Sequence, residues 1–277
     1  MLGAARELWQ RWRAPAARHA PRLRIVVRQS PDWRHTPHAE LLEGSRAFCR
    51  AVGAATGFGE NFISDVVGVW DATFATSYFQ VRALMKDIAQ ENLREVRSAT
   101  LVPLAAAHAD AALAPLHVFI DDDDWLRADI CDALQPHLDG ADGYIFGNIL
   151  CVSRIELRRL EDGCYTNNYA VASPYLARHG GRCESVAQHW DANQAFHHPE
   201  FRRRYVPLYL SATNKHPASA MKLKDGLQHD ALSGNTLRRL VEAFVDESAQ
   251  AQAPEPAAWV LPYARRVRGV FADLLRR

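Results

Sequence analysis

The sequence predicts an α/β protein with a mixed β-sheet and helices on both of its faces. The front half alternates short apolar runs with stretches of helical periodicity, which is typical of strands joined by crossover helices. The middle of the chain instead alternates polar and apolar residues, which indicates strands with one wet face. Together these patterns favour a sheet of mixed strand direction over a purely parallel one.

The bulk composition is that of a folded chain. Of 277 residues, 48% are hydrophobic and 23% are charged, values that exclude a disordered chain. The formal net charge of +1 gives no global field that would point to nucleic acid as a partner. Five scattered cysteines without a C-x-x-C pair indicate reduced, buried thiols, and so we expect a cytoplasmic protein.

Three segments are expected along the chain. Residues 1–22 form a basic N-terminal segment whose apolar residues are too interrupted for a signal peptide. Residues 23–246 form one main domain, and residues 247–277 form a linker and a basic amphipathic C-terminal helix. Either basic terminus could contact the inner face of the membrane through anionic lipid, and packing on the domain is the alternative for both.

In the front half, residues 23–28 (LRIVVR) form an apolar run rich in β-branched residues, which predicts a buried strand. Further strands are expected at 101–104 and 117–120. Helical spacing predicts helices at 40–52 and 77–93.

In the middle, helical spacing predicts a helix over residues 125–137, and the apolar run at 144–146 predicts a strand. Alternating residues at 154–158 and 165–171 flank Asp162-Gly163, a dipeptide that favours tight turns. A β-hairpin is therefore expected there.

In the last third, we expect a strand at 205–210 and a helix at 233–244 that begins in a Ser/Asn cap region. The composition of 249–256 (AQAQAPEP) predicts a linker, and the pattern of residues 262–277 predicts the final basic helix.

Four adjacent aspartates, Asp121 to Asp124, follow the apolar strand HVFI directly. Their charges repel one another beside a core, and bound Mg²⁺ or Mn²⁺ would offset that repulsion, because hard cations prefer oxygen ligands. Ligands of open α/β sheets bind beyond the carboxyl ends of strands, so a cation here could hold a diphosphate. The alternative is a surface turn that caps a helix beginning near Trp125.

The segment VFIDDDDWL resembles the strand and D-x-D signature of GT-A-fold glycosyltransferases, and more narrowly the D-x-D-D segment of a bacterial rhamnosyltransferase-like family. Looser matches are the first strand with its terminal Arg28, the stretch 70–82, and TNKHPAS at 213–219. The family usually carries an arginine just before the acidic segment, where this chain has Phe119-Ile120.

This resemblance implies a GT-A-like, Rossmann-like fold and a metal-dependent glycosyltransferase of bacterial surface-polysaccharide assembly. The partners would be a nucleotide-diphosphate-sugar donor and a glycan or lipid-linked acceptor. Asp123 would be the direct metal ligand, and Asp121 would be a second metal-binding candidate that also lies near the donor ribose or uracil-type base. Asp124 would contact the sugar or a second-shell water, and Asp122 would either contact the donor or only be solvated. Arg28 would join the donor-binding residues.

A late histidine often completes the metal site of GT-A enzymes, and His216 is the residue that the resemblance suggests here. Lys215 beside it could pair with the donor diphosphate. Both lie in a polar segment after a predicted strand, so an ordinary surface loop is the alternative.

An inverting transferase needs a general base for the acceptor hydroxyl. Asp191 is the first candidate, followed by Glu184 and His189, which all lie in CESVAQHWDANQ. The alternative is a solvated helix, on which Glu184 and Gln188 would share one face at i,i+4 spacing.

Two other functions also fit the aspartates. One is a phosphatase or phosphotransferase of the haloacid-dehalogenase type with Asp121 as nucleophile, although that motif usually lies near the N-terminus and continues with Thr or Val rather than Trp125. The other is a non-catalytic carbohydrate-assembly module.

Overall fold

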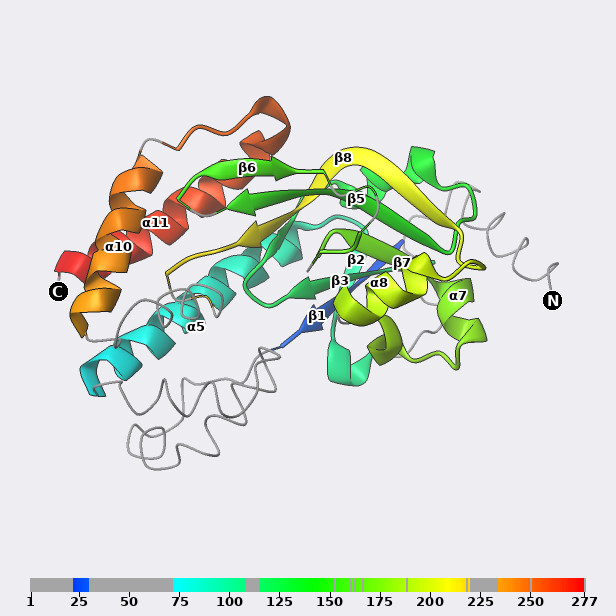
Figure 1. The fold of residues 1–277 in the computed structure, drawn as a ribbon, viewed down its shortest axis with the longest axis horizontal. Coiled ribbons are helices and arrows are strands. Elements are labelled where there is room, and N and C mark those ends of the chain that lie inside the picture. Colours follow the sequence, from blue (N-terminus) through cyan, green and yellow to red (C-terminus); the bar gives the residue numbers. More distant parts are fainter. Residues whose placement is uncertain are drawn as a thin grey trace. The chain divides into compact units, whose positions relative to one another are not determined.

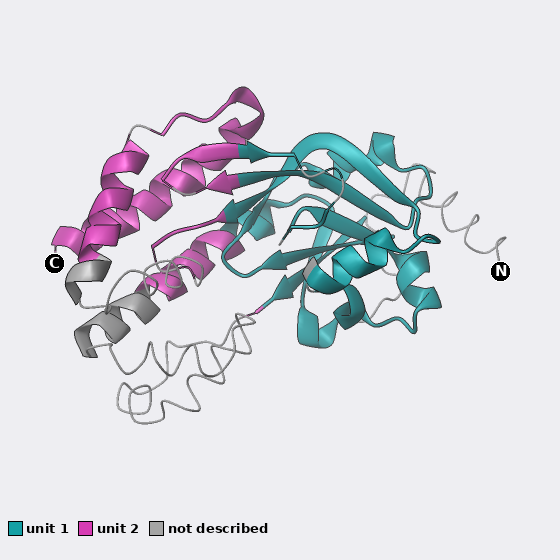
Figure 2. Cartoon of the chain, viewed as in Figure 1, with its two compact units in different colours: residues 1–28, 91–149, 157–213 teal, residues 29–90, 150–156, 214–277 magenta. Residues whose placement is uncertain are grey.

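The structure is a computed structural model, and it describes residues 22–29, 72–107, 115–151, 153–159, 161, 163–165, 167–187, 189–217, 219, 234–249 and 251–276. The expected helix at 40–52 and residues 1–21 of the basic N-terminal segment lie outside the described residues. The chain separates into two compact units (Figure 2): unit 1 comprises residues 1–28, 91–149 and 157–213, and unit 2 comprises residues 29–90, 150–156 and 214–277.

The described strands form one mixed eight-stranded sheet (Figure 1). They are β1 (Leu23–Arg28), β2 (Ala99–Pro103), β3 (Leu116–Asp121), β4 (Trp125–Leu126), β5 (Gly143–Cys151), β6 (Ile155–Arg158), β7 (Tyr169–Ala172) and β8 (Arg203–Asn214). Their order is β2-β1-β3-β7-β5-β8-β4, with β6 paired to β5. β1 runs parallel to β2 and β3, whereas β7 runs antiparallel to β3 and β5. The predicted mixed sheet is therefore confirmed.

The described helices are distributed along the chain from α5 to α11. They are α5 (Ala72–Glu95), η2 (Leu104–Ala106), α6 (Ile130–Leu134), η3 (Gln135–His137), α7 (Ser173–Arg178), η4 (Cys183–Val186), α8 (His189–His197), α10 (Gly234–Ala249), η5 (Glu255–Val260) and α11 (Leu261–Arg276). The helices expected at 77–93, 233–244 and 262–277 are confirmed as α5, α10 and α11, with shifted ends.

Alternate residues of the central strands enter two separate hydrophobic cores of unit 1, because successive side chains of a strand point to opposite faces. In β1, Ile25 packs into the core that contains α6, and Val26 packs into the core that contains α7, η4 and α8. In β3, Ile120 and Phe119 divide between the two cores in the same way. Helices therefore cover both faces of the sheet, as predicted.

Two sequence predictions of local structure are wrong. Trp125-Leu126 does not begin a helix but forms β4, pairing antiparallel with β8, and α6 begins only at Ile130. The Asn92 side chain stabilises β4 by accepting a hydrogen bond from Leu126 N (2.8 Å) and donating one to Leu126 O (3.0 Å). The expected hairpin is not formed either, because β6 pairs with β5 while β7 lies between β3 and β5.

The order of the strands reverses at β1. α5 leads from β1 to β2 on one side, and the chain then returns to place β3 on the other side of β1. The carboxyl ends of β1 and β3 therefore form a topological switch point, where open α/β sheets bind ligands. Arg28 and Asp121, the last residues of these two parallel strands, are register partners.

In unit 2, helices α10 and α11 pack against each other through aromatic residues. The rings of Phe244 and Phe271 meet edge to face with centroids 5.3 Å apart, and Val267 is also buried. Arg268 Nε donates to the carbonyl of Val245 at 3.1 Å. The apolar stripe of the C-terminal helix α11 thus packs against α10 at these positions.

No helix of the described chain is long and apolar enough to span a membrane.

The cysteines of the described chain are free and buried, as the sequence predicted: Cys131, Cys151, Cys164 and Cys183. Burial raises the pKa of Cys131 to about 12 and that of Cys183 to about 11. Thiols with such pKa values are protonated at neutral pH and hence unreactive.

The buried His117 of β3 predicts a loss of stability in acid. Burial and, secondarily, the Arg24 charge lower the pKa of His117 to about 4 from an ordinary 6.5. The unfolded state therefore binds a proton between pH 6.5 and 4 that the folded state does not, and the free energy of unfolding falls as the pH falls. The expected loss is about 3 kcal/mol.

Urea unfolding at several pH values would measure this loss in the wild type and in His117→Gln. Glutamine can still meet the Ser173 hydroxyl, which lies 3.2 Å from His117 Nδ1, but it does not titrate. The variant should lack this part of the pH dependence. An identical slope in both proteins would show that another group is responsible.

Candidate functional site

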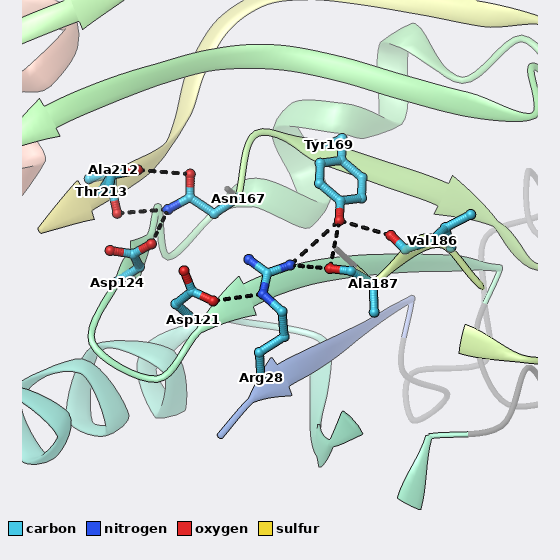
Figure 3. Close-up of polar contacts among 9 residues, drawn as sticks. All are labelled: Arg28, Asp121, Asp124, Asn167, Tyr169, Val186, Ala187, Ala212 and Thr213. Carbon is cyan, nitrogen blue, oxygen red and sulfur yellow. Dashed lines mark hydrogen bonds and ion pairs between the residues drawn. The ribbon is translucent and has the colours of Figure 1, made fainter. Parts of the chain in front are cut away.

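Arg28 is the centre of a buried polar cluster at the switch point (Figure 3). Its side chain is 9% exposed, and Nε donates to Asp121 Oδ1 at 2.6 Å. Nη1 donates to the carbonyl of Ala187 at 2.5 Å and approaches the Tyr169 hydroxyl at 3.5 Å. Burial is the largest single effect on the pKa of Arg28 and would lower it, but the charges of Asp121, Tyr169 and Asp124 and the hydrogen bond to Asp121 together outweigh burial and raise this pKa above its ordinary value. The guanidinium therefore stays charged.

Tyr169 connects this cluster to the backbone of Val186 and Ala187. Its hydroxyl lies 2.9 Å from the carbonyl of Val186 and 3.0 Å from that of Ala187, which are alternative acceptors for its single proton. The ring stacks on Phe119 at 5.7 Å, and burial raises the pKa of Tyr169. Arg28 and Tyr169 together hold the connection between η4 and α8 against the carboxyl ends of β1 and β3.

Asp124 belongs to a second buried network. Its Oδ2 accepts a hydrogen bond from Asn167 Nδ2 at 2.9 Å, and the same amide donates to the carbonyl of Ala212 at 3.0 Å. Thr213 Oγ1 donates to Asn167 Oδ1 at 3.3 Å and accepts from Asn148 Nδ2 at 2.8 Å. A chain of amides and a hydroxyl thus links β5 and β8 to the acidic turn and fixes the Asp124 carboxylate. Figure 3 shows the part of this network formed by Asp124, Asn167, Ala212 and Thr213.

The acidic turn is only partly exposed. Asp122 is 6% exposed and Asp124 2%, whereas the Asp121 side chain is 37% exposed and Asp123 is half-buried. The expectation that Asp122 is only solvated is wrong. So is the reading of the turn as a surface cap for a helix near Trp125, because β4 follows the turn directly.

The donor atoms of this turn suit a hard divalent cation, since carboxylate oxygens are the ligands that Mg²⁺ and Mn²⁺ prefer. Among the residues that the structure describes, no group of three or more His, Cys, Asp and Glu side chains is arranged to hold a metal ion. A cation here would thus have one or two carboxylate ligands, with the rest of its shell from water and phosphate, as is usual for Mg²⁺. The Arg28 guanidinium already neutralises Asp121, which leaves Asp123 as the first candidate ligand.

The other two donor and metal candidates lie in unit 2. His216 is 0% exposed, and its ring centroid lies 5.9 Å from that of Phe271. Lys215 is half-buried, and its backbone N–H donates to the carbonyl of Cys151 at 2.7 Å. The alternative of an ordinary surface loop is therefore wrong for His216. The metal role of His216 and the diphosphate role of Lys215 stay predictions.

The three candidate bases do not share one helix. Glu184 is exposed in η4, the chain turns at Ala187, and α8 begins at His189 with Asp191 half-buried in its first turn. The expected i,i+4 pairing of Glu184 with Gln188 stays a prediction, because Gln188 lies outside the described residues. Which of the three residues acts as base stays a prediction.

Sequence reasoning missed the residues that organise the two networks. The alternating pattern predicts only strand residues at Tyr169 and Asn167, Thr213 enters only as the first residue of the TNKHPAS match, and Asn148 carries no recognised signal. An asparagine pair, Asn167-Asn168, inside a run of strand-like residues is the one available sign, because buried amides require hydrogen-bond partners.

Comparisons with known proteins give little further support. No protein-family model matches the chain, and no curated protein matches it. Among solved structures, the crystal structure of S. aureus TarS 1-349 in complex with UDP-GlcNAc matches with a TM-score of 0.28 and 9% sequence identity. The match covers 64% of this chain and 56% of that chain. A likeness this low decides neither fold nor function, so both rest on the geometry of the described residues.

Proposed function

We propose that this chain is a metal-dependent glycosyltransferase that moves a sugar from a nucleotide-diphosphate-sugar donor to a glycan or lipid-linked acceptor in bacterial surface-polysaccharide assembly. The observation that carries this proposal is the Arg28–Asp121 ion pair at the switch point of β1 and β3, where the acidic turn begins. The D-x-D resemblance of the same turn adds the sugar-nucleotide chemistry.

Each part of the site has a role in this proposal. Asp123 would hold the cation, and a cation there would supply charge to neutralise the departing diphosphate. Arg28 and Asp121 bind the nucleoside end of the donor with a rigid pair of charges, and Asp124, fixed by Asn167, contacts the transferred sugar. Such fixed polar groups reduce the reorganisation that the reaction requires.

The transfer itself is a substitution at the anomeric carbon. The acceptor hydroxyl oxygen forms the new bond to this carbon, and the bond from the carbon to the diphosphate oxygen breaks. In an inverting transfer the hydroxyl proton passes to a general base, for which Asp191 in the first turn of α8 is our first candidate.

A thermal-shift screen of UDP-, GDP-, CMP- and dTDP-sugars, each with and without Mn²⁺, tests the proposal. Ligand at about 100 times its Kd stabilises a protein by about 2.7 kcal/mol, which raises the Tm by several degrees in a domain of this size. We expect such a rise for one nucleotide class, and only with the cation. Asp123→Asn should lose it, whereas Asp246→Asn, an exposed change of the same charge on α10, should keep it.

Two outcomes would contradict the proposal. One is the absence of any metal-dependent shift across the screen. The other is an unchanged shift in Asp123→Asn, measured again as an affinity by titration calorimetry. Stabilisation by beryllofluoride with Mg²⁺, together with a phospho-aspartyl adduct on Asp121, would instead favour the phosphotransferase.

A further inference from the structure

Trp190 is conspicuous on the surface of the described chain. It is 69% exposed, compared with 45% for Leu84 and 37% for Leu101, the other exposed large hydrophobic residues that the structure describes. Tryptophan is highly buried on average, and exposed aromatic residues are enriched where proteins bind partners.

The position of Trp190 ties it to the candidate site. It is the second residue of α8 and lies three residues after Ala187, whose carbonyl accepts the 2.5 Å hydrogen bond from Arg28. Three residues of chain separate two Cα atoms by at most about 11 Å. Because Arg28 and Tyr169 fix Val186 and Ala187, the start of α8 is held beside the carboxyl ends of β1 and β3.

The packing of α8 explains the exposure of this side chain. Ala192 and Phe196, one turn apart, are buried in the core beneath the helix. At 100° per residue, Trp190 lies about 200° around the helix from Ala192 and therefore on its outer face. Gln194 follows Trp190 by one turn and is also exposed, and Asp191 beside Trp190 is half-buried.

We propose that Trp190 is the platform on which a pyranose ring of the acceptor stacks, an inference that rests on the proposed function. One face of a pyranose presents C–H groups that suit the flat indole, and its rim presents hydroxyls that suit the carboxylate of Asp191 and the amide of Gln194. An indole flanked by polar side chains fits a sugar ring better than a purely apolar partner. Trp190 would thus be a residue of acceptor specificity, with no part in the chemical step.

The test compares Trp190→Ala, Trp190→Phe and the control Leu101→Ala in two separate measurements. Binding of the methyl glycosides of glucose, galactose, rhamnose and N-acetylglucosamine is followed by saturation-transfer NMR titration without any donor. Donor binding is followed by the metal-dependent thermal shift. We expect Trp190→Ala to weaken glycoside binding at least about tenfold, with most of the affinity retained in Trp190→Phe and all of it in Leu101→Ala.

The two measurements separate this proposal from the function on which it rests. If a glycoside binds in a Trp190-dependent manner but no donor produces a shift, the platform stands and the transferase fails. If the donor shift is present but Trp190→Ala binds glycosides as the wild type does, the platform is overturned and the transferase stands. Failure of every glycoside to bind the wild-type protein would also overturn the platform.

Discussion

Replacing Asp121 by leucine should destabilise the protein by about 2–3 kcal/mol, somewhat less than the ~3–5 kcal/mol expected when a fully buried ion pair loses one partner. The reason is that the Arg28 guanidinium stays behind, with a side chain only 9% exposed and held by the Ala187 carbonyl. The Ala187 carbonyl and the Tyr169 hydroxyl are neutral, and neutral acceptors compensate the desolvation of a cation poorly. Urea unfolding would measure the loss.

Replacing Arg28, the other partner of this ion pair, should destabilise the protein less. Arg28→Met removes the buried charge and leaves Asp121, whose side chain is 37% exposed and can be hydrated. The double variant should recover part of the loss of Asp121→Leu, and a double-mutant cycle gives the coupling energy. As a control, Glu242→Gln breaks the exposed Arg238–Glu242 pair on α10 and should change stability by less than about 0.5 kcal/mol. Equal losses in the two single variants would contradict this account of the pair.

If the proposed transferase function holds, replacing Asn167 by aspartate should lower sugar transfer by more than about 100-fold, because the replacement disturbs the carboxylate of Asp124 directly. The substitution places a second carboxylate where the amide now donates to Asp124 Oδ2 at 2.9 Å, and both residues are buried. Two buried carboxylates at hydrogen-bond distance cannot both ionise, so one must take up a proton or the turn must move. Transfer to an added acceptor, at saturating donor and metal, would measure the loss.

Relative to the wild type, the same variant should become more stable as the pH falls. A carboxyl whose pKa is raised by folding binds its proton more tightly in the folded state. Its contribution to stability is therefore present in acid and is lost as the pH rises above about 4. Asn167→Asp should accordingly gain stability relative to the wild type between pH 7 and pH 5 in urea unfolding. A constant difference over this range would argue against close carboxylates.

A swap of the two side chains is the matched control. Asp124→Asn combined with Asn167→Asp restores one amide and one carboxylate at the same contact, so stability should largely return. Transfer should remain low if the reaction needs the carboxylate on the turn itself. Recovery of both stability and transfer would mean that the contact matters and its polarity does not.

Much of this fold could be predicted from local pattern. Residues 23–28 form β1 as predicted, because a short apolar run rich in β-branched residues favours a buried strand. The run at 117–120 likewise became β3, and α11 followed its amphipathic pattern. By contrast, Trp125-Leu126 is too short to carry a pattern, and its strand state depends on pairing with β8 and on the Asn92 side chain.

Only part of the candidate site could likewise be predicted from the sequence. The acidic turn and Arg28 could be found from sequence, because charged residues directly after apolar strands are unusual and the D-x-D pattern is short. The Arg28–Ala187 contact could not, since a backbone carbonyl has no residue signature and lies 159 positions away. The alternating pattern likewise predicts only a strand residue at Asn167, although its amide donates a hydrogen bond to Asp124, 43 positions away.

These long separations bear on how the protein is made. Asp121 follows Arg28 by 93 residues and Ala187 follows it by 159, so the native partners of this buried cation are synthesised long after it. At about 5–20 residues per second, a ribosome needs roughly 8–32 s to add the 159 residues from Arg28 to Ala187. Contacts this distant in sequence form slowly even in the complete chain. The strand that carries Arg28 thus leaves the ribosome well before the residues that pair with it, and a chaperone could bind it during that interval.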